Sequence, residues 1–531
     1  MNRKTLVLPA VVGLLAPLLA ACGVPDGGGE DGGSIVVGTT DRFVAPREAP
    51  APFDPAVADG SGARSVLRQT LQTLVRLPDD GGAPVPEAAE KCGFTDTGSE
   101  SYRCTLRSGL TFADGGELTA EDVTYSIQRV LRIRTPHGPA ALLDTLDTVE
   151  AVNDREVVFH LRASDATFPY KLATPTAGIV PRGSYPADAP REGFQVDGSG
   201  PYTMKPQVRD GRVTKIAFTP NPRYRGSLRI RNEGVELALY PDTTALGRAF
   251  DAGRVDLMTR TLSPQQAQRL RERTGGGSAL TEMSGLTIGY LGFDTEDPAV
   301  RNTAVRRAMA QIVDRDRITG QVYGSTAEPL YSLIPSGVTG HTSAFFDVYG
   351  EPSADKAAAM FRKAKIPTPV RLTLHYPTDH DGPATAAEFR MLRQQLNDSG
   401  LFDVTVRGVP WATYRAARLR GDYAVYGMSR TPDFPDPDNF TAPFLGPDNV
   451  LGSPYRSEDA ERRLIPQSRR ESDRSAATTM FTRLQDIVAR DVPVLPLWQA
   501  KQYVAARDGV TGAARSVDSG SALRLWEIGR E

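Results

Sequence analysis

The side chains best suited to bind a charged group lie on an acidic loop at residues 430–440. The loop reads RTPDFPDPDNF, so Asp433, Asp436 and Asp438 follow one another closely. The prolines between them hold the preceding residues in extended backbone, which makes the loop stiff. Three carboxylates could bind a cation, but the prolines displace the alternating acids and central glycine of a calcium loop. The same aspartates could instead cap turns or the start of a helix.

A second group of potential metal ligands comprises His375, Asp379 and His380. A proline breaks any regular spacing between them, so we interpret them as surface residues. The chain has five histidines and no Gly-x-Ser-x-Gly motif, so the pattern offers no nucleophile with a paired base. We therefore predict no metal site, no cofactor and no catalytic residue.

The N-terminus is typical of an exported, lipid-anchored protein. Two basic residues precede an apolar run at 6–18, which is too short to span a membrane comfortably. The run leads into Leu-Ala-Ala-Cys, which resembles a bacterial lipobox with Cys22 as the lipidated residue. We predict a signal peptide at 1–21 and a flexible tether at 22–33. These features place the protein on the extracytoplasmic face of the cell membrane, held only by its lipid anchor.

The other two cysteines are Cys92 and Cys104. Cys104 lies on an alternating strand and Cys92 just before Gly93-Phe94, so a hairpin could bring the two together. In an exported protein a disulfide is the default state of such a pair. A catalytic or metal-binding role would need histidines or acids nearby, and none is visible in the pattern. We predict a structural disulfide.

Length and charge narrow the class of protein further. The chain of 531 residues is long enough for about three domains of ordinary size. Its 40% share of apolar residues is ordinary for a globular protein. The net charge is −2, and no basic block of the kind that follows a phosphate backbone is present, so we expect no nucleic acid partner.

The clearest local structure is a strand, a turn and a helix at residues 101–132. Tyr102, Cys104 and Leu106 alternate with polar residues, which predicts a half-buried strand. Thr119 is followed by acidic residues and then by apolar residues at helical spacing. This pattern predicts a capped helix that buries one face.

Other segments predict further helices and strands. Apolar spacing favours helices at 65–77 and 300–318, and a short apolar run favours a strand at 177–181. Arg306, on the second of these helices, is expected to be solvated, and Trp498 is expected to pack in the core rather than stack on a ligand. Strand, helix and strand recur along the chain, which indicates α/β lobes.

The strand, turn and helix at 101–132 also carry a resemblance to a known family. Leu-Arg-x-Gly-x-x-Phe-x-Asp-Gly at 106–115 and Leu-Thr-Ala-Glu-Asp-Val-x-Tyr-Ser at 118–126 are similar to the hallmark of the bacterial extracellular solute-binding protein family 5. These proteins are the peptide-binding lipoproteins of ABC importers. Gly-Ser-Gly-Pro-Tyr at 198–202 departs by one serine from the usual turn of the family. The resemblance covers nearly the whole chain from residue 34 to about residue 497.

The resemblance implies an α/β protein with the type II periplasmic-binding-protein fold. Two lobes would surround a hinged cleft, and the first lobe would be split into two domains. The chain would cross between the lobes near residues 285 and 490. The implied domains are a main domain of lobe 1 at 34–62, 195–285 and 491–531, a smaller domain of lobe 1 at 63–194, and lobe 2 at 286–490.

The resemblance also gives the acidic loop a role. In the family this position carries a W..D..DP segment whose first aspartate holds the α-amino group of a bound peptide, and Asp433 matches that aspartate. An ionised carboxylate suits an ammonium group because the hydrogen bond between them is charge-assisted. Arg430 stands where the family usually has tryptophan, and it could neutralise Asp433 internally. The candidate ligand-binding residues are Asp433, Arg430, Phe434 and Asp436.

The implied function is that of the substrate-binding lipoprotein of an ABC importer. It would capture a peptide or a similar small solute and deliver it to a membrane permease with its ATPase subunits. It would act as a monomer and would not be an enzyme. Three alternatives stay open: a binding protein for a non-peptide ligand such as a metal chelate or an oligosaccharide, a lipid-anchored extracellular hydrolase, and a signalling or chaperone module that has lost transport.

Overall fold

The computed structural model describes residues 33–531, except 48, 59, 80, 137, 260–261, 274–275, 325, 447–448 and 450–451. Residues 34–531 form one unit. The predicted signal peptide, the lipidated Cys22 and most of the tether lie outside the described residues. Within the described part, no helix is both long enough and apolar enough to cross a membrane.

One large mixed β-sheet runs through this unit. Among the described residues its strands are β1 (Ile35–Thr39), β8 (Tyr202–Arg209), β9 (Arg212–Pro220), β10 (Val235–Leu239), β11 (Leu257–Thr259), β12 (Ser278–Phe293), β13 (Ala327–Pro329), β14 (Val370–Pro377), β15 (Phe402–Val409), β16 (Val425–Arg430) and β17 (Val494–Arg507). Their order is β15-β14-β16-β12-β17-β11-β1-β10-β9-β8, with β13 paired to β17. The parallel pairs β1–β10, β1–β11, β14–β15 and β14–β16 are the strand pairings expected of α/β architecture.

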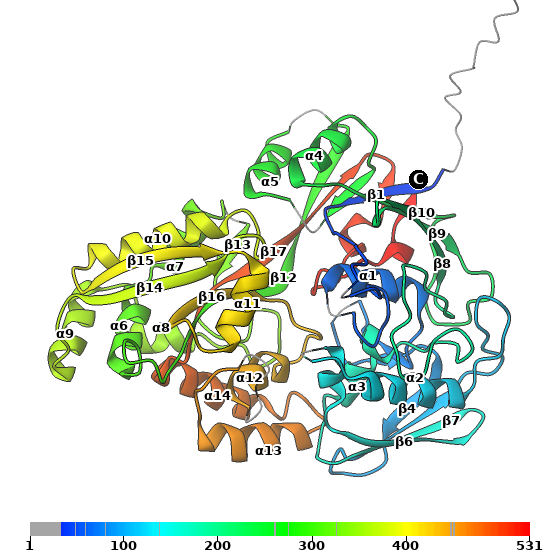
Figure 1. The fold of residues 1–531 in the computed structure, drawn as a ribbon, viewed down its shortest axis with the longest axis horizontal. Helices are drawn as coiled ribbons and strands as arrows, with labels where there is room; N and C mark the ends of the chain where they lie inside the picture. The colour runs from blue at the N-terminus through cyan, green and yellow to red at the C-terminus, as the bar shows by residue number, and fades with distance from the viewer. Residues whose placement is uncertain are drawn as a thin grey trace, which may run out of the picture. The chain divides into compact units, whose positions relative to one another are not determined.

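The two longest strands, β12 and β17, run side by side through the middle of the unit (Figure 1). Residues 278–284 of β12 pair with 501–507 of β17, and residues 288–292 pair with 494–499. The register shifts between Ser284 and Ile288, so the two paired stretches are separated by an irregular step. This step marks where the chain passes from one set of packed elements to the other.

The buried apolar side chains lie in separate clusters on either side of this step. The largest cluster is built from residues between Leu286 and Trp498, and we refer to the part of the structure around it as lobe 2. Two further clusters are built mainly from residues between Ile35 and Leu237 and between Val504 and Ile528, and we refer to their surroundings as lobe 1. Leu495 and Trp498 therefore pack in lobe 2, whereas the sequence predicted the second crossing near residue 490. The domain boundaries themselves stay a prediction.

Lobe 2 covers its end of the sheet with helices. They are α6 (Thr303–Ile312), α7 (Arg315–Gln321), α8 (Ala344–Tyr349), α9 (Ala354–Ala364), α10 (Thr385–Asp398), α11 (Trp411–Leu419), α12 (Asp438–Leu445), η3 (Ala460–Leu464), α13 (Ile465–Arg470) and α14 (Thr478–Asp491). Side chains of α6, α10 and α14 fill the core under β12 and β14, among them Met309, Phe389 and Leu484.

Lobe 1 contains a second, smaller sheet in addition to its half of the large one. Its helices are α1 (Ser61–Thr70), α2 (Ala120–Ile133), α3 (Phe168–Leu172), α4 (Thr243–Asp251) and α5 (Pro264–Arg271), with the short turns η1 (Pro139–Leu143), η2 (Pro175–Ala177), η4 (Ala513–Arg515) and η5 (Leu525–Glu527). Its remaining strands are β2 (Val75–Arg76), β3 (Val85–Pro86), β4 (Ala89–Phe94), β5 (Ser101–Leu106), β6 (Leu146–Asn153), β7 (Glu156–Leu161), β18 (Val510–Thr511) and β19 (Gly529–Arg530). The strands β4-β5-β7-β6 form a four-stranded sheet beside α2 (Figure 1).

The predicted strand, turn and helix at 101–132 are confirmed as β5 and α2. Tyr102, Cys104 and Leu106 are buried on one face of β5, as the alternation predicted. At the start of α2 the backbone N–H of Thr119 donates to the carboxylate of Asp122 over 2.9 Å. The start and the buried face of this helix could therefore be predicted from the local sequence.

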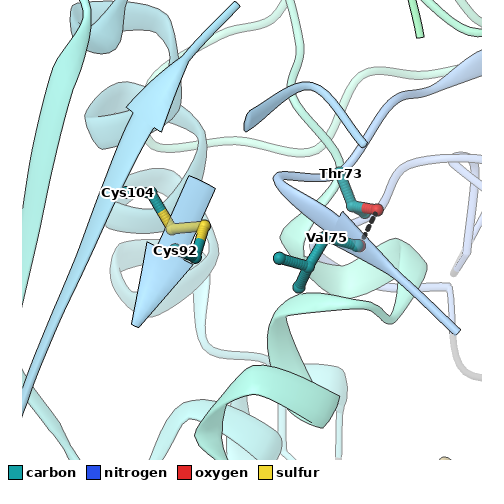
Figure 2. Close-up of a disulfide and its surroundings, with 4 residues drawn as sticks. All are labelled: Thr73, Val75, Cys92 and Cys104. Carbon is teal, nitrogen blue, oxygen red and sulfur yellow. Dashed lines mark hydrogen bonds between the residues drawn. A yellow bond between two sulfur atoms is a disulfide. The ribbon is translucent and has the colours of Figure 1, made fainter. Parts of the chain in front are cut away.

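The structure joins Cys92 and Cys104 across the hairpin. The two residues are directly paired on β4 and β5, their Cα atoms lie 4.1 Å apart, and their sulfur atoms are bonded. Figure 2 shows the bond beside Thr73 and Val75, whose side chain and carbonyl are hydrogen-bonded. The pair thus lies at the edge of the core formed by β5, β7 and α2.

We expect this disulfide to be present in the exported protein. Iodoacetamide applied to the denatured, non-reduced protein should then label neither Cys92 nor Cys104, and after reduction it should label both. Because the bond closes a loop of about a dozen residues, its removal should lower the free energy of unfolding by about 3 kcal/mol. Labelling of both cysteines without a reductant would contradict the expectation.

Three predicted elements differ from those observed. The helix predicted at 65–77 is α1, which ends at Thr70, because residues 71–74 leave the helix and lead into the short strand β2. The helix predicted at 300–318 is divided into α6 and α7, because the side chain of Asp314 accepts from the backbone N–H of Arg317 and starts a new helix. The strand predicted at 177–181 is wrong: Ala177 is the last residue of η2, and residues 178–181 have no regular structure.

The expectation that Arg306 is solvated is also wrong. Its side chain is 3% exposed and donates to the backbone carbonyls of Val300, Asp491 and Val492, among others. It therefore ties α6 to the end of α14 inside lobe 2. A guanidinium group can be buried in this way because carbonyl oxygens satisfy its donors.

Candidate functional site

A cavity of about 350 Å³ lies where the two lobes meet the long strands. Its walls come from both lobes and from β12 and β17. The lining segments are residues 77–79, 81, 283–284 and 286, 336–339, 432–435, 502, 514–515, 517–520 and 524. Small-molecule sites are commonly concave and of this size, and they commonly lie at the junction of domains.

Asp433 lies on the wall of this cavity, and its carboxylate joins the two lobes. Arg64 on α1 of lobe 1 forms an ion pair with it, and the Arg430 guanidinium approaches it to 3.5 Å from the other side. The backbone N–H of Asp433 donates to the side chain of Asn439 over 2.9 Å, which fixes the loop. The carboxylate therefore has two cationic neighbours, one from each lobe.

These neighbours set the ionisation of Asp433. Burial alone would raise its pKa, but the positive charges of Arg64 and Arg430 outweigh burial and hold the pKa below the usual value. The side chain is 21% exposed, so it is partly screened by water. Asp433 is thus a carboxylate at neutral pH, and the group of three side chains carries a net positive charge.

The other candidate residues of the acidic loop have different surroundings. Phe434 lines the cavity, is 3% exposed and packs against Tyr170 of lobe 1 with ring centroids 5.8 Å apart. Asp436 is not among the lining residues; Arg474 binds it through two nitrogens at 2.7 and 2.9 Å. Arg430 reaches the cavity only through Asp433.

Two arginines downstream of the loop fix its shape. Asp436 is 1% exposed, and this burial raises its pKa despite the opposing charge of Arg474. Asp438, the first residue of α12, is held through both carboxylate oxygens by Arg469 at 3.0 and 3.1 Å. The loop is therefore held by arginine pairs, in addition to its prolines, and presents Asp433 and Phe434 to the cavity.

The remaining charged side chains of the cavity wall are also paired. Asp518 forms an ion pair with Arg68 of α1, and Arg524 with Asp79 at 3.1 Å. Burial would raise the pKa of Asp518, but Arg68 and Arg524 together lower it. The cavity wall thus offers carboxylates and guanidinium groups that already hold one another.

Two further hydrogen bonds join the lobes. The backbone N–H of Ala166 donates to the carbonyl of Arg469 over 2.7 Å, and the Ser99 hydroxyl donates to the carbonyl of Arg470 over 3.2 Å. Both arginines are at the end of α13 in lobe 2, whereas Ser99 and Ala166 belong to lobe 1. Together with the Arg64–Asp433 pair, these bonds describe a conformation in which the lobes touch.

His375 and His380, the two histidines considered above as potential metal ligands, each stack on an aromatic ring. The His380 ring lies flat on Trp411 with centroids 3.6 Å apart, and the His375 ring lies on Tyr423 with centroids 4.1 Å apart. Within the described residues, no three histidine, cysteine, aspartate or glutamate side chains gather so as to hold a metal ion.

Trp498 packs in lobe 2, as predicted. It is 6% exposed, its ring lies against Tyr323, and its indole N–H donates to Glu388 over 3.1 Å. Glu388 is itself buried, with 4% of its surface exposed. Burial raises the pKa of Glu388 to about 7, although its hydrogen bonds with Tyr323 and Trp498 act in the opposite direction.

This buried carboxyl group should make stability depend on pH. An unfolded glutamate has a pKa of about 4.3, so between about pH 4.5 and pH 7 the folded chain keeps a proton that the unfolded chain releases. Stability should therefore fall as pH rises through this range. We expect Glu388→Gln to match the wild type near pH 4.5 and to exceed its free energy of unfolding at pH 8 by on the order of 3 kcal/mol. Parallel pH curves from urea unfolding would contradict this role.

Sequence reasoning missed the lobe 1 residues of the site. Arg64, Arg68, Asp79 and Asp518 come from segments that carry no motif, and Arg64 is 369 positions away from Asp433. On α1 the two arginines lie four residues apart, so they share the face opposite the buried Val66. That charged face could have been recognised in the sequence, but the sequence does not show which residues form ion pairs with it.

The structure thus has two α/β lobes joined by two long strands, with a cavity where the lobes meet. The family model described as bacterial extracellular solute-binding proteins, family 5 Middle, matches residues 83–452. The chain therefore belongs to family 5 of the bacterial extracellular solute-binding proteins, which confirms the family predicted from residues 106–126.

Individual relatives agree over most of the chain. The di/tripeptide-binding protein 1 of Pseudomonas aeruginosa is 22% identical over 87% of this chain and 89% of its own length. The probable deoxycholate-binding periplasmic protein YgiS of Escherichia coli is 27% identical over 85% of this chain and 86% of its own.

A solved structure confirms the fold class. The periplasmic binding protein DppA of Helicobacter pylori, in complex with the peptide STSA, superposes with a TM-score of 0.78 at 19% identity. The match covers 94% of this chain and 98% of that one. The predicted α/β periplasmic-binding-protein fold is therefore the fold of this chain.

Proposed function

We propose that this protein is the solute-binding component of an ABC importer and that it captures a small peptide or a similar zwitterionic solute in the cavity between its lobes. The observation that carries the proposal is the cavity itself, with walls from both lobes and from the two strands that join them. A solute that touches both lobes stabilises the conformation in which they are closed. Delivery to a membrane permease with its ATPase would follow release.

The paired charges of the cavity wall favour a zwitterion over a solute whose only charge is an ammonium group. An ammonium group can replace Arg64 beside Asp433 only if another anion takes over Arg64. A peptide brings both charges, so its ammonium and carboxylate can exchange partners with the pair without leaving a buried charge alone. The names of two relatives, a di/tripeptide-binding protein and a probable deoxycholate-binding protein, support peptides first and a non-peptide solute as the alternative.

Within this proposal the candidate residues have distinct roles. Asp433 and Phe434 contact the solute, since both line the cavity. Arg430 acts through the carboxylate of Asp433, and Asp436 holds the loop through Arg474. Lipidation of Cys22, attachment to the outer face of the cell membrane and action as a monomer without enzymatic activity belong to the same proposal and rest on the sequence.

The experiment that tests the function is the identification of the natural solute. Residues 34–531 are purified from cells under native conditions and denatured, and the released small molecules are identified by mass spectrometry. We expect one class of solute, enriched over the buffer and recovered unchanged after incubation with fresh protein. Conversion of that solute by the pure protein would instead indicate a hydrolase.

A further inference from the structure

A second, smaller cavity lies in lobe 1 next to the cleft. Its volume is about 40 Å³, and it shares Leu77 and Arg524 with the wall of the large cavity. We name it the Gln72–Trp526 pocket after two of its lining residues, which also include Arg68, Arg76, Glu87 and Arg524.

Two side chains of this pocket each have a polar atom that is not hydrogen-bonded. The side-chain oxygen of Gln72 and the indole N–H of Trp526 are both buried and have no hydrogen-bond partner among the described residues. Gln72 is 2% and Trp526 4% exposed. Leaving a buried donor or acceptor unsatisfied costs roughly 1–3 kcal/mol. Two such atoms on residues that line one cavity therefore indicate that the cavity binds a group that forms hydrogen bonds.

The orientation of the Gln72 amide follows from its neighbour. Its nitrogen donates to the Glu87 carboxylate over 3.2 Å. The flipped orientation would place the amide oxygen against that carboxylate, where two acceptors would repel each other. The unsatisfied atom of Gln72 is therefore an acceptor, and the pocket lacks one hydrogen-bond donor for it.

Both residues are held firmly in place by their backbones. The carbonyl of Gln72 accepts from Ile179, and the carbonyl of Trp526 accepts from Arg231. The turn at 198–202 packs on the end of α1 just before Gln72: a Cβ atom at Gly200 would lie 2.4 Å from the carbonyl carbon of Thr70. The glycines of this turn thus let it approach and fix the chain that carries Gln72.

The charges around the pocket are already paired. Arg68 is bound to Asp518, Arg524 to Asp79, and Arg76 lies 3.8 Å from Glu87. Glu87 also accepts from Tyr224 and from the backbone N–H of Ser227 at 3.0 Å. A charged group in the pocket would therefore have no unpaired counter-charge among the described residues. The Gln72 oxygen and the Trp526 indole N–H instead match a neutral group that donates one hydrogen bond and accepts one.

We propose that the Gln72–Trp526 pocket is a subsite of the cleft that binds a carboxamide group of the solute. The amide N–H donates to Gln72, and the amide oxygen accepts from the indole N–H of Trp526. A volume of about 40 Å³ exceeds what a single water needs, so a small group such as a carboxamide fits. The subsite rests on the proposed function and adds to it a chemical feature of the solute.

The test uses the indole N–H of Trp526 as a direct probe. The chain has three tryptophans, so a ¹⁵N-labelled sample of residues 34–531 gives few indole signals, and Trp526→Phe identifies the one from Trp526. Propionamide represents a side-chain carboxamide, and N-methylacetamide represents a peptide bond. We expect at least one of them to shift the Trp526 signal saturably, with the Trp498 signal unchanged because its N–H is bound to Glu388.

Two comparisons make the result decisive. Propionate has the shape of propionamide with a charge, and we expect it to bind at least tenfold more weakly. Gln72→Met keeps the length of the side chain without the acceptor and should weaken amide binding about tenfold, the loss of one hydrogen bond. Gln207→Met, at an exposed position of β8, is the matched control and should leave the titration unchanged.

The proposal is overturned if neither amide moves the Trp526 signal, if propionate acts as strongly as propionamide, or if Gln72→Met has no effect. The pocket would then hold ordered water only. Should Gln72→Met fail to fold, the propionamide and propionate titrations of the wild type still decide. None of these results depends on the natural solute, so failure of the subsite is distinct from failure to find a solute by mass spectrometry.

Discussion

Replacing Asp433 with alanine is expected to lower the affinity for the natural solute at least tenfold. In the closed conformation the carboxylate lies between Arg64 of lobe 1 and Arg430 of lobe 2. Without it, two guanidinium groups whose side chains are 18% and 14% exposed would face each other, so closing the lobes would cost more free energy. Since the solute binds the closed form, that cost appears as lost affinity in a calorimetric titration.

Arg64→Met separates this role from direct capture of an amine. If Asp433 acts through the pair, Arg64→Met should also weaken binding, and the double variant should lose less than the sum of the two single losses. If Asp433 only holds a ligand amine, Arg64→Met should bind as tightly as the wild type while Asp433→Ala does not. That second pattern would contradict the interlobe role of the pair.

Replacing Arg129 with methionine is expected to cause the largest loss of stability. Arg129 on α2 is 1% exposed and binds both oxygens of the buried Asp54, at 2.8 and 2.5 Å. It also donates to the carbonyls of Pro186 and Ala189. Its removal leaves the Asp54 carboxylate buried without a counter-charge, which costs about 3–5 kcal/mol. The urea midpoint of unfolding should fall accordingly.

The matched control is Arg103→Met on β5. Arg103 also forms an ion pair, with Glu156 at 2.8 Å, but its side chain is 51% exposed. An exposed pair of this kind contributes about 0–1 kcal/mol, so the urea midpoint should hardly move. Equal losses from the two substitutions would mean that burial of the Arg129–Asp54 pair does not determine its importance.

Much of the scaffold could be predicted because its rules are local. The alternation of Tyr102, Cys104 and Leu106 fixed the buried face of β5, and Thr119 with Asp122 fixed the start of α2. The same residues carried the family motif, so the fold class followed from them. Each of these features depends on residues a few positions apart, and the sequence shows such spacing directly.

The predictions that were wrong concern residues whose structural neighbours are distant in sequence. Arg306 was expected in solvent, but it also donates to carbonyls at the end of α14, about 185 positions later. Thr70 ends α1 seven residues earlier than the apolar stripe suggested, because the following residues hydrogen-bond to the segments at 86–89 and 179. Tertiary contacts override local periodicity in both cases.

For the same reason, only part of the candidate site could be predicted from the sequence. The acidic loop could be found by its composition, and the structure places Asp433 and Phe434 on the cavity wall. Its electrostatic partners could not be found, since Arg64 and Asp433 belong to different lobes. A sequence can show that a carboxylate lies on a stiff loop, whereas only the fold shows that two arginines already hold it.

The most direct test of a cleft-bound solute is the amount that each variant carries. Thr339 lines the cavity and is exposed, so Thr339→Trp should fill the site without disturbing the core. Thr203→Trp, at an exposed position of β8 outside the cavity, is the control. After native purification and denaturation, the wild type and the control should release the same solute in similar molar amounts, and Thr339→Trp less than a tenth of it. Equal release from all three proteins, or release from none, would contradict capture of a solute between the lobes.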